Sequence, residues 1–280
     1  MNTLISAQQL HALDPKNVLI VDCRSDIADS ERAPRDYAKA HIPGAVYADL
    51  NRDLSDLSKQ GVGRHPLPDA AAFSRVLSRW GWTPQTFVVT YDDAGGALAA
   101  ARLWWMLRLV GGNAAVLDGG IKSWNAAGFE LTDAIESRAA SKVEVAFDAS
   151  QIVMTDELQR LRGDDRTLLL DARAAPRYRG ETEPIDPVAG HVPGARNRPF
   201  SENLAADGAF KTAASLRDGF TAVVGAHQPR DVVHMCGSGV TACHNLLAME
   251  HAGLAGSRIY APSWSGWIAD AKRDVAVGAG

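Results

Sequence analysis

Short, mostly apolar runs recur along the chain between polar or glycine-rich segments. Four of them are Val18–Val21, Phe87–Thr90, Thr167–Leu170 and Asp231–His234. Continuous runs of this length are typical of strands that are buried on both faces of a sheet. We therefore predict a strand at each of the four positions.

Helical patterns separate these runs. Ser6 and Gln9 have the spacing of a capping box that opens a helix. Phe73–Trp80 and Leu98–Leu109 carry apolar residues at helical spacing, and glycines follow both segments. Strands that alternate with helices predict an α/β fold, with a mostly parallel sheet and helices on both of its faces.

The chain also repeats itself. Four segments of the first half match segments of the second half in the same order and at a nearly constant offset. The pairs are VLIVDCR with TLLLDAR, AHIPGA with GHVPGA, FVVTYD with DVVHMC, and DGGIKSW with APSWSGW. This pattern predicts a duplicated domain, with copies at residues 1–133 and 149–280. Residues 134–148 have little periodicity and mixed charge, and are predicted to form the linker.

The run that ends at His234 leads into a cysteine, Cys236, which is followed by Gly237 and Gly239 and then by a helical pattern. Glycines allow the backbone to curl around the sulfur, and successive N–H groups in such a loop form an anion-binding nest. The start of the next helix adds its positive end. Both effects favour the thiolate, so we predict that Cys236 is a nucleophile. The alternative is a buried structural cysteine, the role we expect for Cys23 and Cys243.

The paired Asp–x–Arg and His–x–Pro–Gly–Ala segments and the loop CGSGVTA together resemble the two-domain sulfurtransferases, the rhodanese and 3-mercaptopyruvate sulfurtransferase group. The resemblance covers nearly the whole chain, and the loop is closest to the mercaptopyruvate branch. It implies tandem rhodanese-like domains, of which only the C-terminal one is catalytic. Asp92 stands where the first copy would need its cysteine, and a carboxylate cannot carry sulfur. We expect Asp92 to bind the amides of its own loop.

The resemblance also implies a Ser–His–Asp relay, with Ser238 and His65 as its first two members. From the residues alone, Ser238 could equally be a turn serine that bonds its own backbone. The acidic member is left open, because Asn51 stands where an aspartate is expected and Asp49 and Asp53 are its neighbours.

Substrate binding is predicted for three arginines and for the loop that follows the cysteine. Arg173 follows a buried strand, at the sheet edge where ligands bind in open α/β folds. Its alternative role is an ion pair with Asp171, because Asp22 and Arg24 repeat the pair in the inactive half. The predicted substrate-binding residues are Arg173, Arg179, Arg64, Gly237, Gly239, Val240 and Thr241.

The predicted reaction moves a sulfur atom from 3-mercaptopyruvate to a thiol or cyanide through a persulfide on Cys236. Thiosulfate is the alternative donor, but Gly237 and Ser238 are neutral where the thiosulfate branch carries cations. A cysteine phosphatase would need an arginine at position 242, which is Ala242. A non-catalytic sulfur-binding module would not need the nucleophile.

Composition and charge limit the binding partners and the cellular location that can be expected. The net charge of −4 gives no basic footprint for nucleic acid or an anionic membrane surface. Three cysteines among 280 residues argue against a disulfide framework, and neither a signal peptide nor a membrane span is predicted. We expect a cytoplasmic monomer without metal or cofactor, whose acceptors include small thiols, cyanide and a thioredoxin-like protein. Trp264 and Trp267 are expected in the core, with a wall of the active site as their alternative place.

Overall fold

A computed structural model describes residues 3–135, 138–162, 164 and 166–279. Contacts between Cα atoms divide the chain into two compact units. Unit 1 is Met1–Asp56, Leu67–Asp148 and Ala206–Phe210, and unit 2 is Leu57–Pro66, Ala149–Ala205 and Lys211–Gly280. Each unit therefore includes a short segment that comes from the other half of the sequence.

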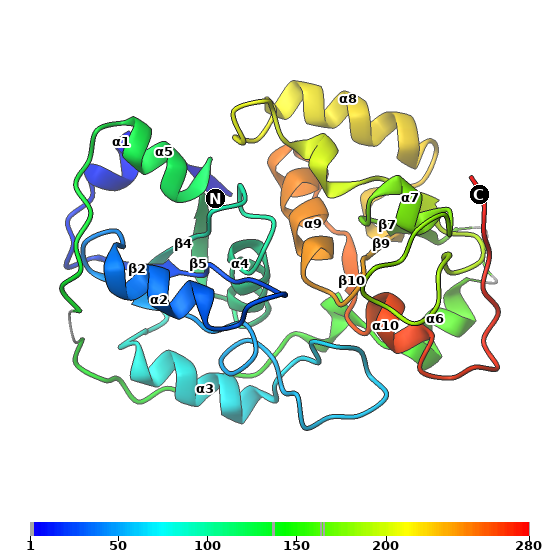
Figure 1. Ribbon diagram of the computed structural model, residues 1–280, viewed down its shortest axis with the longest axis horizontal. Helices are drawn as coiled ribbons and strands as arrows, with labels where there is room; N and C mark the ends of the chain where they lie inside the picture. Colours follow the sequence, from blue (N-terminus) through cyan, green and yellow to red (C-terminus); the bar gives the residue numbers. More distant parts are fainter. Residues whose placement is uncertain (1–2, 136–137, 163, 165, 280) are drawn as a thin grey trace. The chain divides into compact units, whose positions relative to one another are not determined.

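Unit 1 is built on a parallel five-stranded sheet in the order β1-β5-β4-β2-β3. Its elements follow one another as strand and helix (Figure 1). They are β1 (Leu4–Ile5), α1 (Ala7–His11), β2 (Val18–Asp22), α2 (Arg32–Lys39), β3 (Ala45–Tyr47), α3 (Ala70–Arg79), β4 (Phe87–Tyr91), α4 (Ala100–Leu109), β5 (Asn113–Leu117) and α5 (Gly120–Ala126).

Unit 2 repeats this topology with the strand order β6-β10-β9-β7-β8, again entirely parallel. Its strands and helices, with three 3-10 turns, are η1 (Ala149–Gln151), β6 (Ile152–Val153), α6 (Thr155–Leu161), β7 (Leu168–Asp171), α7 (Ala175–Tyr178), β8 (Arg196–Asn197), η2 (Phe200–Asn203), α8 (Ala213–Val224), η3 (Pro229–Asp231), β9 (Val232–Met235), α9 (Thr241–His251), β10 (Arg258–Tyr260) and α10 (Ser263–Trp267).

Alternate residues of each strand face opposite sides of the sheet, so each sheet carries two apolar surfaces. In unit 1, Ile20 and Val89 belong to the core under α1 and α5. On the other face, Thr90 donates a hydrogen bond to the carbonyl of Ala100 in α4. Unit 2 likewise packs α6, α7 and α10 on one face and α9 on the other. The predicted α/β class, with helices on both faces of a parallel sheet, is confirmed.

The elements begin and end close to the predicted positions. The four predicted strands are observed with ends displaced by no more than a residue. The Ser6–Gln9 capping box opens α1, with the Ser6 hydroxyl accepting from the Gln9 N–H at 3.1 Å. The helix predicted from Phe73 begins earlier, at Ala70, because Asp69 caps it by accepting from the Ala72 N–H at 2.6 Å.

The predicted linker, residues 134–148, lies partly outside the described residues, at 136–137. Its later part runs along α3. Ser141 donates its backbone N–H to the carbonyl of Ser78 at 2.9 Å, and Val145 donates to the hydroxyl of Ser74 at 3.0 Å. The boundaries 1–133 and 149–280 stay a prediction, to which the two units add that residues 57–66 belong with unit 2.

Candidate active site

Cys236 directly follows β9, at the carboxyl end of the parallel sheet of unit 2. The residue is 2% exposed. The Gly239 N–H points back at the sulfur, with N and Sγ 3.1 Å apart. Gly239 has a φ of +82°, a conformation that residues with a Cβ rarely adopt. Since α9 begins at Thr241, the positive end of that helix directly follows the loop that curls around the sulfur.

The loop after β10 holds the cysteine from the other side. The Ser263 hydroxyl accepts the Cys236 N–H at 3.1 Å and donates to the carbonyl of Tyr260 at 3.0 Å. Ser263 has a φ of +53°, which is uncommon for a residue other than glycine. The Trp264 and Ser265 N–H groups bond the carbonyls of Cys236 and Gly237 at 2.9 Å each. Ser263 could not be predicted as a site residue, because no sequence pattern indicates its backbone conformation.

The segment 57–66 brings a histidine to the loop. His65 Nδ1 lies 2.8 Å from Ser238 Oγ, and both side chains are buried. The direction of this hydrogen bond depends on the tautomer of the ring. The preceding residue, Arg64, is anchored by its backbone N–H to the Ser265 hydroxyl at 2.9 Å. Three residues that were predicted for the site therefore meet at one loop.

The candidates for an acidic relay member all have local partners in unit 1. The Asp49 carboxylate accepts the N–H groups of Asn51 and Arg52 at 2.8 and 2.9 Å. The Asp53 carboxylate accepts the Asp49 N–H at 2.9 Å and pairs with Arg79 at 2.7 Å. These contacts form a capped turn, and the acidic member stays a prediction.

Two guanidinium groups lie beside Gly237, the residue after the nucleophile. A Cβ built on Gly237 would lie 3.1 Å from Arg64 Nη2 and 3.6 Å from Arg177 Nη2. Both arginines contact the carboxylate of Asp186: Arg64 through a short ion pair, and Arg177 at 3.2 Å. Glu183 completes the cluster, because it accepts from Arg177 at 2.7 Å. Arg173 Nη1 also lies 3.5 Å from the Glu183 carboxylate and pairs with Asp171, so three guanidinium groups and three carboxylates balance one another.

Burial and charge act in opposite directions on these acids. Burial raises the pKa of Asp186 above its usual value, against the effect of the neighbouring Arg64. Burial also works to raise the pKa of Glu183, but hydrogen bonds from Arg177 and from two backbone N–H groups outweigh it and hold that pKa below its usual value. One donor is left over: among the described residues, the buried Nε of Arg64 has no hydrogen-bond partner.

The two other predicted arginines have structural partners. Arg173 is buried, grips Asp171 with its fork at 2.6 to 3.1 Å, donates to the carbonyl of Gly190 and stacks over Trp264. Arg24 grips Asp22 in the same way in unit 1, where Asp92 stands at the position that corresponds to Cys236. This repetition favours a scaffold role for Arg173.

Arg179 pairs with Glu181 on the surface at 2.6 Å. The arginine at the loop is instead Arg177, two residues earlier in the same PRYRG stretch. Arg177 was not predicted from the sequence, because the choice between Arg177 and Arg179 depends on which way each side chain leaves the one-turn helix α7. The contacts therefore favour Arg177 in place of Arg179.

In unit 1 the loop after β4 corresponds to the Cys236 loop, and a carboxylate of the chain itself, Asp92, binds its backbone N–H groups. The Asp92 carboxylate accepts backbone N–H groups from Ala94, Gly96, Leu98 and Ala100 at 2.9, 2.7, 3.0 and 3.4 Å. Burial raises the pKa of Asp92 to about 6, although the four hydrogen bonds lower it. The prediction that Asp92 anchors its own loop is confirmed.

The remaining candidates lie in the cores. Trp264, Trp267, Cys23 and Cys243 are all buried, as expected for core residues. No group of three or more potential metal-ligating side chains occurs among the described residues. Within the same residues, no helix is long and apolar enough to cross a membrane.

Comparison with known proteins places this site in a family. The model of the rhodanese-like domain matches residues 6–127 and 154–270. The chain belongs to the rhodanese family and carries two rhodanese-like domains, as the sequence predicted.

Within that family, the chain is 47% identical to a probable 3-mercaptopyruvate sulfurtransferase of Pseudomonas aeruginosa, over 98% of both chains. It is 36% identical to a putative thiosulfate sulfurtransferase, SseB, of Mycobacterium tuberculosis, over 97% of this chain and 94% of the relative. The crystal structure of SseA from Escherichia coli, a 3-mercaptopyruvate sulfotransferase, superposes with a TM-score of 0.80 at 28% identity, covering 95% of this chain and all of that one.

Proposed function

We propose that the protein is a sulfurtransferase that moves a sulfane sulfur from 3-mercaptopyruvate to a thiol or cyanide acceptor through a persulfide on Cys236. The observation that carries the proposal is the sulfur of Cys236, held at the Gly239 N–H in a loop that also contains the His65–Ser238 pair. The close relatives named as sulfurtransferases support it.

In the first half-reaction, the Cys236 thiolate attacks the sulfur atom of mercaptopyruvate. A sulfur–sulfur bond forms, the carbon–sulfur bond breaks, and its electron pair leaves with the three-carbon fragment as the enolate of pyruvate. A proton then converts the enolate into pyruvate. The hydrogen-bonded Ser238 and His65 are placed to carry that proton from the donor thiol to the enolate, which is general acid–base catalysis.

In the second half-reaction, the acceptor attacks the outer sulfur and the Cys236 thiolate leaves. A thiol acceptor becomes a persulfide, and cyanide becomes thiocyanate. The persulfide is a covalent intermediate that divides one transfer into two displacements. The loop that cradles the thiolate, including Val240 and Thr241 at the start of α9, can cradle the persulfide anion in the same place.

The donor is held by the arginines beside Gly237. A carboxylate can accept from Arg64 Nε, the unused buried donor, and from the guanidinium of Arg177. Because Asp186 and Glu183 already balance these two cations, the site suits a donor with a single negative charge. Thiosulfate, a compact dianion, is the second candidate donor, favoured by the name of the mycobacterial relative.

Intact-mass measurement tests the proposal. The protein is incubated with mercaptopyruvate and compared with Cys236→Ser. We expect a gain of one sulfur atom, with pyruvate released in equal amount, and no gain in the variant. A sulfur gain that persists in Cys236→Ser would overturn the assignment of the nucleophile. A thioredoxin-like acceptor, the monomeric state and the cytoplasmic location are proposed from the sequence alone.

A further inference from the structure

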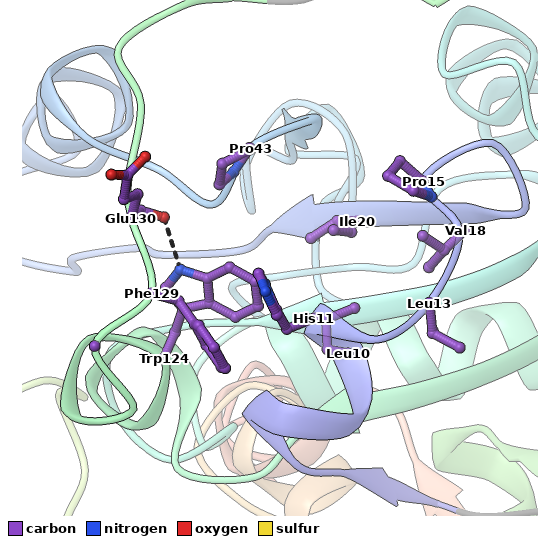
Figure 2. Close-up of a pocket in the computed structure, with 11 residues that line it drawn as sticks. Leu10, His11, Leu13, Pro15, Val18, Ile20, Pro43, Trp124, Phe129 and Glu130 are labelled. Atoms are coloured by element: carbon purple, nitrogen blue, oxygen red, sulfur yellow. Dashed lines mark hydrogen bonds between the residues drawn. The ribbon is translucent and has the colours of Figure 1, made fainter.

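A second hollow of unit 1 is lined by none of the residues of the Asp92 loop. It is a cavity of about 490 Å³ beside α1, β2 and the end of α5. One side is aromatic: the His11 ring stacks on Phe129 at 4.0 Å, and Phe129 leans on Trp124 at 4.9 Å. Figure 2 shows these rings opposite the apolar side chains of Leu13, Pro15, Val18 and Ile20, with Glu130 beyond the indole. A cavity of this size and lining is in the range of small-molecule sites.

The duplicated domain shows what occupies the corresponding place in unit 2. Trp267 stands where Trp124 does in the repeat, and its indole N–H donates to the carbonyl of Asp274 at 2.9 Å. The guanidinium groups of Arg162 and Arg273 lie 5.2 and 5.7 Å from its ring. The carboxylate of Asp274 is 3.5 Å from Arg162. The second copy therefore holds a cation between an indole ring and a carboxylate.

Unit 1 has the same hydrogen bond from the indole but lacks the two arginines. The Trp124 indole N–H donates to the carbonyl of Glu130 at 2.9 Å, as its counterpart does to Asp274 (Figure 2). Phe129 precedes Glu130 as Arg273 precedes Asp274. Ile5 in β1 and Val153 in β6 occupy equivalent places in the two sheets. Asp14 follows Ile5 by the same number of residues as Arg162 follows Val153, so Asp14 corresponds to Arg162.

The residues of unit 1 that correspond to Arg162 and Arg273 are Asp14 and Phe129, and neither carries a positive charge. The Asp14 carboxylate accepts the Lys16 N–H at 3.0 Å and the Asn17 amide at 3.3 Å, so it serves its own turn. Glu130 is exposed, and in the described part of the chain its carboxylate has no ion-pair partner. Aromatic rings and Glu130 thus line an apolar cavity at the place where the duplicate has guanidinium groups.

We propose that this cavity of unit 1 binds a small organic monocation, with its guanidinium or alkylammonium head between Trp124 and the Glu130 carboxylate and its apolar body among Leu13, Val18 and Ile20. Aromatic faces and a carboxylate both attract such a head, while the apolar wall accepts a hydrocarbon or ring. The site is separate from sulfur transfer and does not depend on the proposed function.

Calorimetric titration of the full chain with phenethylguanidinium tests the proposal, and phenethylurea serves as the neutral probe of the same shape. We expect the cation to bind at least about fivefold more tightly than the urea, as one cation–π contact and one exposed carboxylate would give. Glu130→Gln should lower the ratio of the two affinities by roughly threefold or more. Glu31→Gln, which alters an exposed carboxylate elsewhere in unit 1, is the matched control and should leave it unchanged.

The place of binding is checked separately. In the NMR spectrum the indole N–H signal of Trp124 should move on titration with the cation, and the signal of Trp267 should not. Leu13→Trp, which fills the cavity, should abolish the shift while the melting temperature reports that the variant is folded. Equal affinity for cation and urea, an unmoved Trp124 signal, or binding only of arginine-containing peptides would each overturn the proposal.

Discussion

His65 Nδ1 and Ser238 Oγ form a buried hydrogen bond of 2.8 Å across a sequence separation of 173 residues. The bond joins the segment 57–66 to the loop of the candidate nucleophile within one compact unit. It gives Ser238 a partner other than its own backbone. It also favours the relay interpretation over the turn serine that the residues alone left open.

Removal of either partner should slow the step that forms the persulfide. Without the pair, the departing enolate loses its positioned proton source, and such a loss typically costs ~10²–10⁴-fold in rate. Single-turnover formation of pyruvate from mercaptopyruvate by His65→Ala and Ser238→Ala measures this step. His227→Ala is the matched control, because its ring contacts the carbonyl of Val224, the last residue of α8. If only the transfer to the acceptor slows, the pair acts in the other half-reaction.

Cys236 should be the only cysteine that turnover requires. Cys23 and Cys243 are buried without a glycine loop around them, and the Cys243 thiol donates to the carbonyl of Gly239 at 3.3 Å. Cys236→Ser should abolish steady-state sulfur transfer, whereas Cys23→Ser and Cys243→Ser should retain most of it if circular dichroism shows them folded. Full activity of Cys236→Ser would refute the mechanism.

The donor preference should favour mercaptopyruvate over thiosulfate by more than about tenfold in kcat/KM, a difference of ~1.4 kcal/mol. The reason is charge, since Gly237 and Ser238 are neutral and Asp186 balances the guanidinium groups beside them. Steady-state kinetics with both donors measures the ratio. A native preference for thiosulfate would show that this balance does not set specificity.

Asp186→Asn should lower the ratio of kcat/KM for mercaptopyruvate to kcat/KM for thiosulfate. Removal of one negative charge favours both anionic donors, and it favours the dianion more, by roughly fivefold if the extra charge interacts by about 1 kcal/mol in a poorly screened pocket. Asp186→Glu keeps the charge and should keep the wild-type ratio. Glu202→Gln, which breaks an ion pair with Arg198 elsewhere in unit 2, is the control for a general change of charge. An unchanged ratio in Asp186→Asn would exclude Asp186 as a determinant.

Asp92 should make unit 1 less stable as the pH rises from about 4 to 6. The folded pKa of about 6 lies above the unfolded value of ~3.9, so the folded chain holds this proton more tightly. The contribution is therefore fully present below pH ~4 and is lost as the pH rises to 6. Its maximum, at 1.36 kcal/mol per pKa unit, is about 3 kcal/mol.

The difference in melting temperature between the wild type and Asp92→Asn isolates this carboxyl group, because distant titrating groups cancel. Asn should be destabilising throughout, since its amide cannot accept as many N–H groups, but the gap should shrink between pH 4 and 6.5. A gap that widens over this range would mean that the four backbone donors outweigh burial, and that Asp92 is ionised throughout.

The fold could be predicted from the sequence because its signals are local. Apolar runs such as Val18–Val21 define buried strands, and the repeat fixes that both halves share one topology. The misplaced start of α3 is also local in origin, since Asp69 caps the helix four residues before the first strongly apolar position, Phe73.

The site was less accessible to prediction, because much of it depends on where side chains go. Cys236 and its glycines can be identified from the sequence, whereas the choice of Arg177 over Arg179 depends on which way each side chain leaves α7. Asp186 could not be singled out, because its role comes from Arg64, an arginine far away in the sequence that the fold brings to it. The φ of Ser263 is likewise a property of the folded loop.

The segment 57–66 prevents the chain from being divided into two complete domains by a single cut. The unit that carries Cys236 is discontinuous in the chain, because Arg64 and His65 come from the first half of the sequence and Cys236 from the second. A fragment that starts at residue 149 would keep the thiol and its loop but lose His65, the proposed proton carrier, and Arg64, one of the two arginines proposed to bind the donor. The duplicated halves are therefore not interchangeable modules, and a transplant of the second half alone would transfer the nucleophile without its full chemistry.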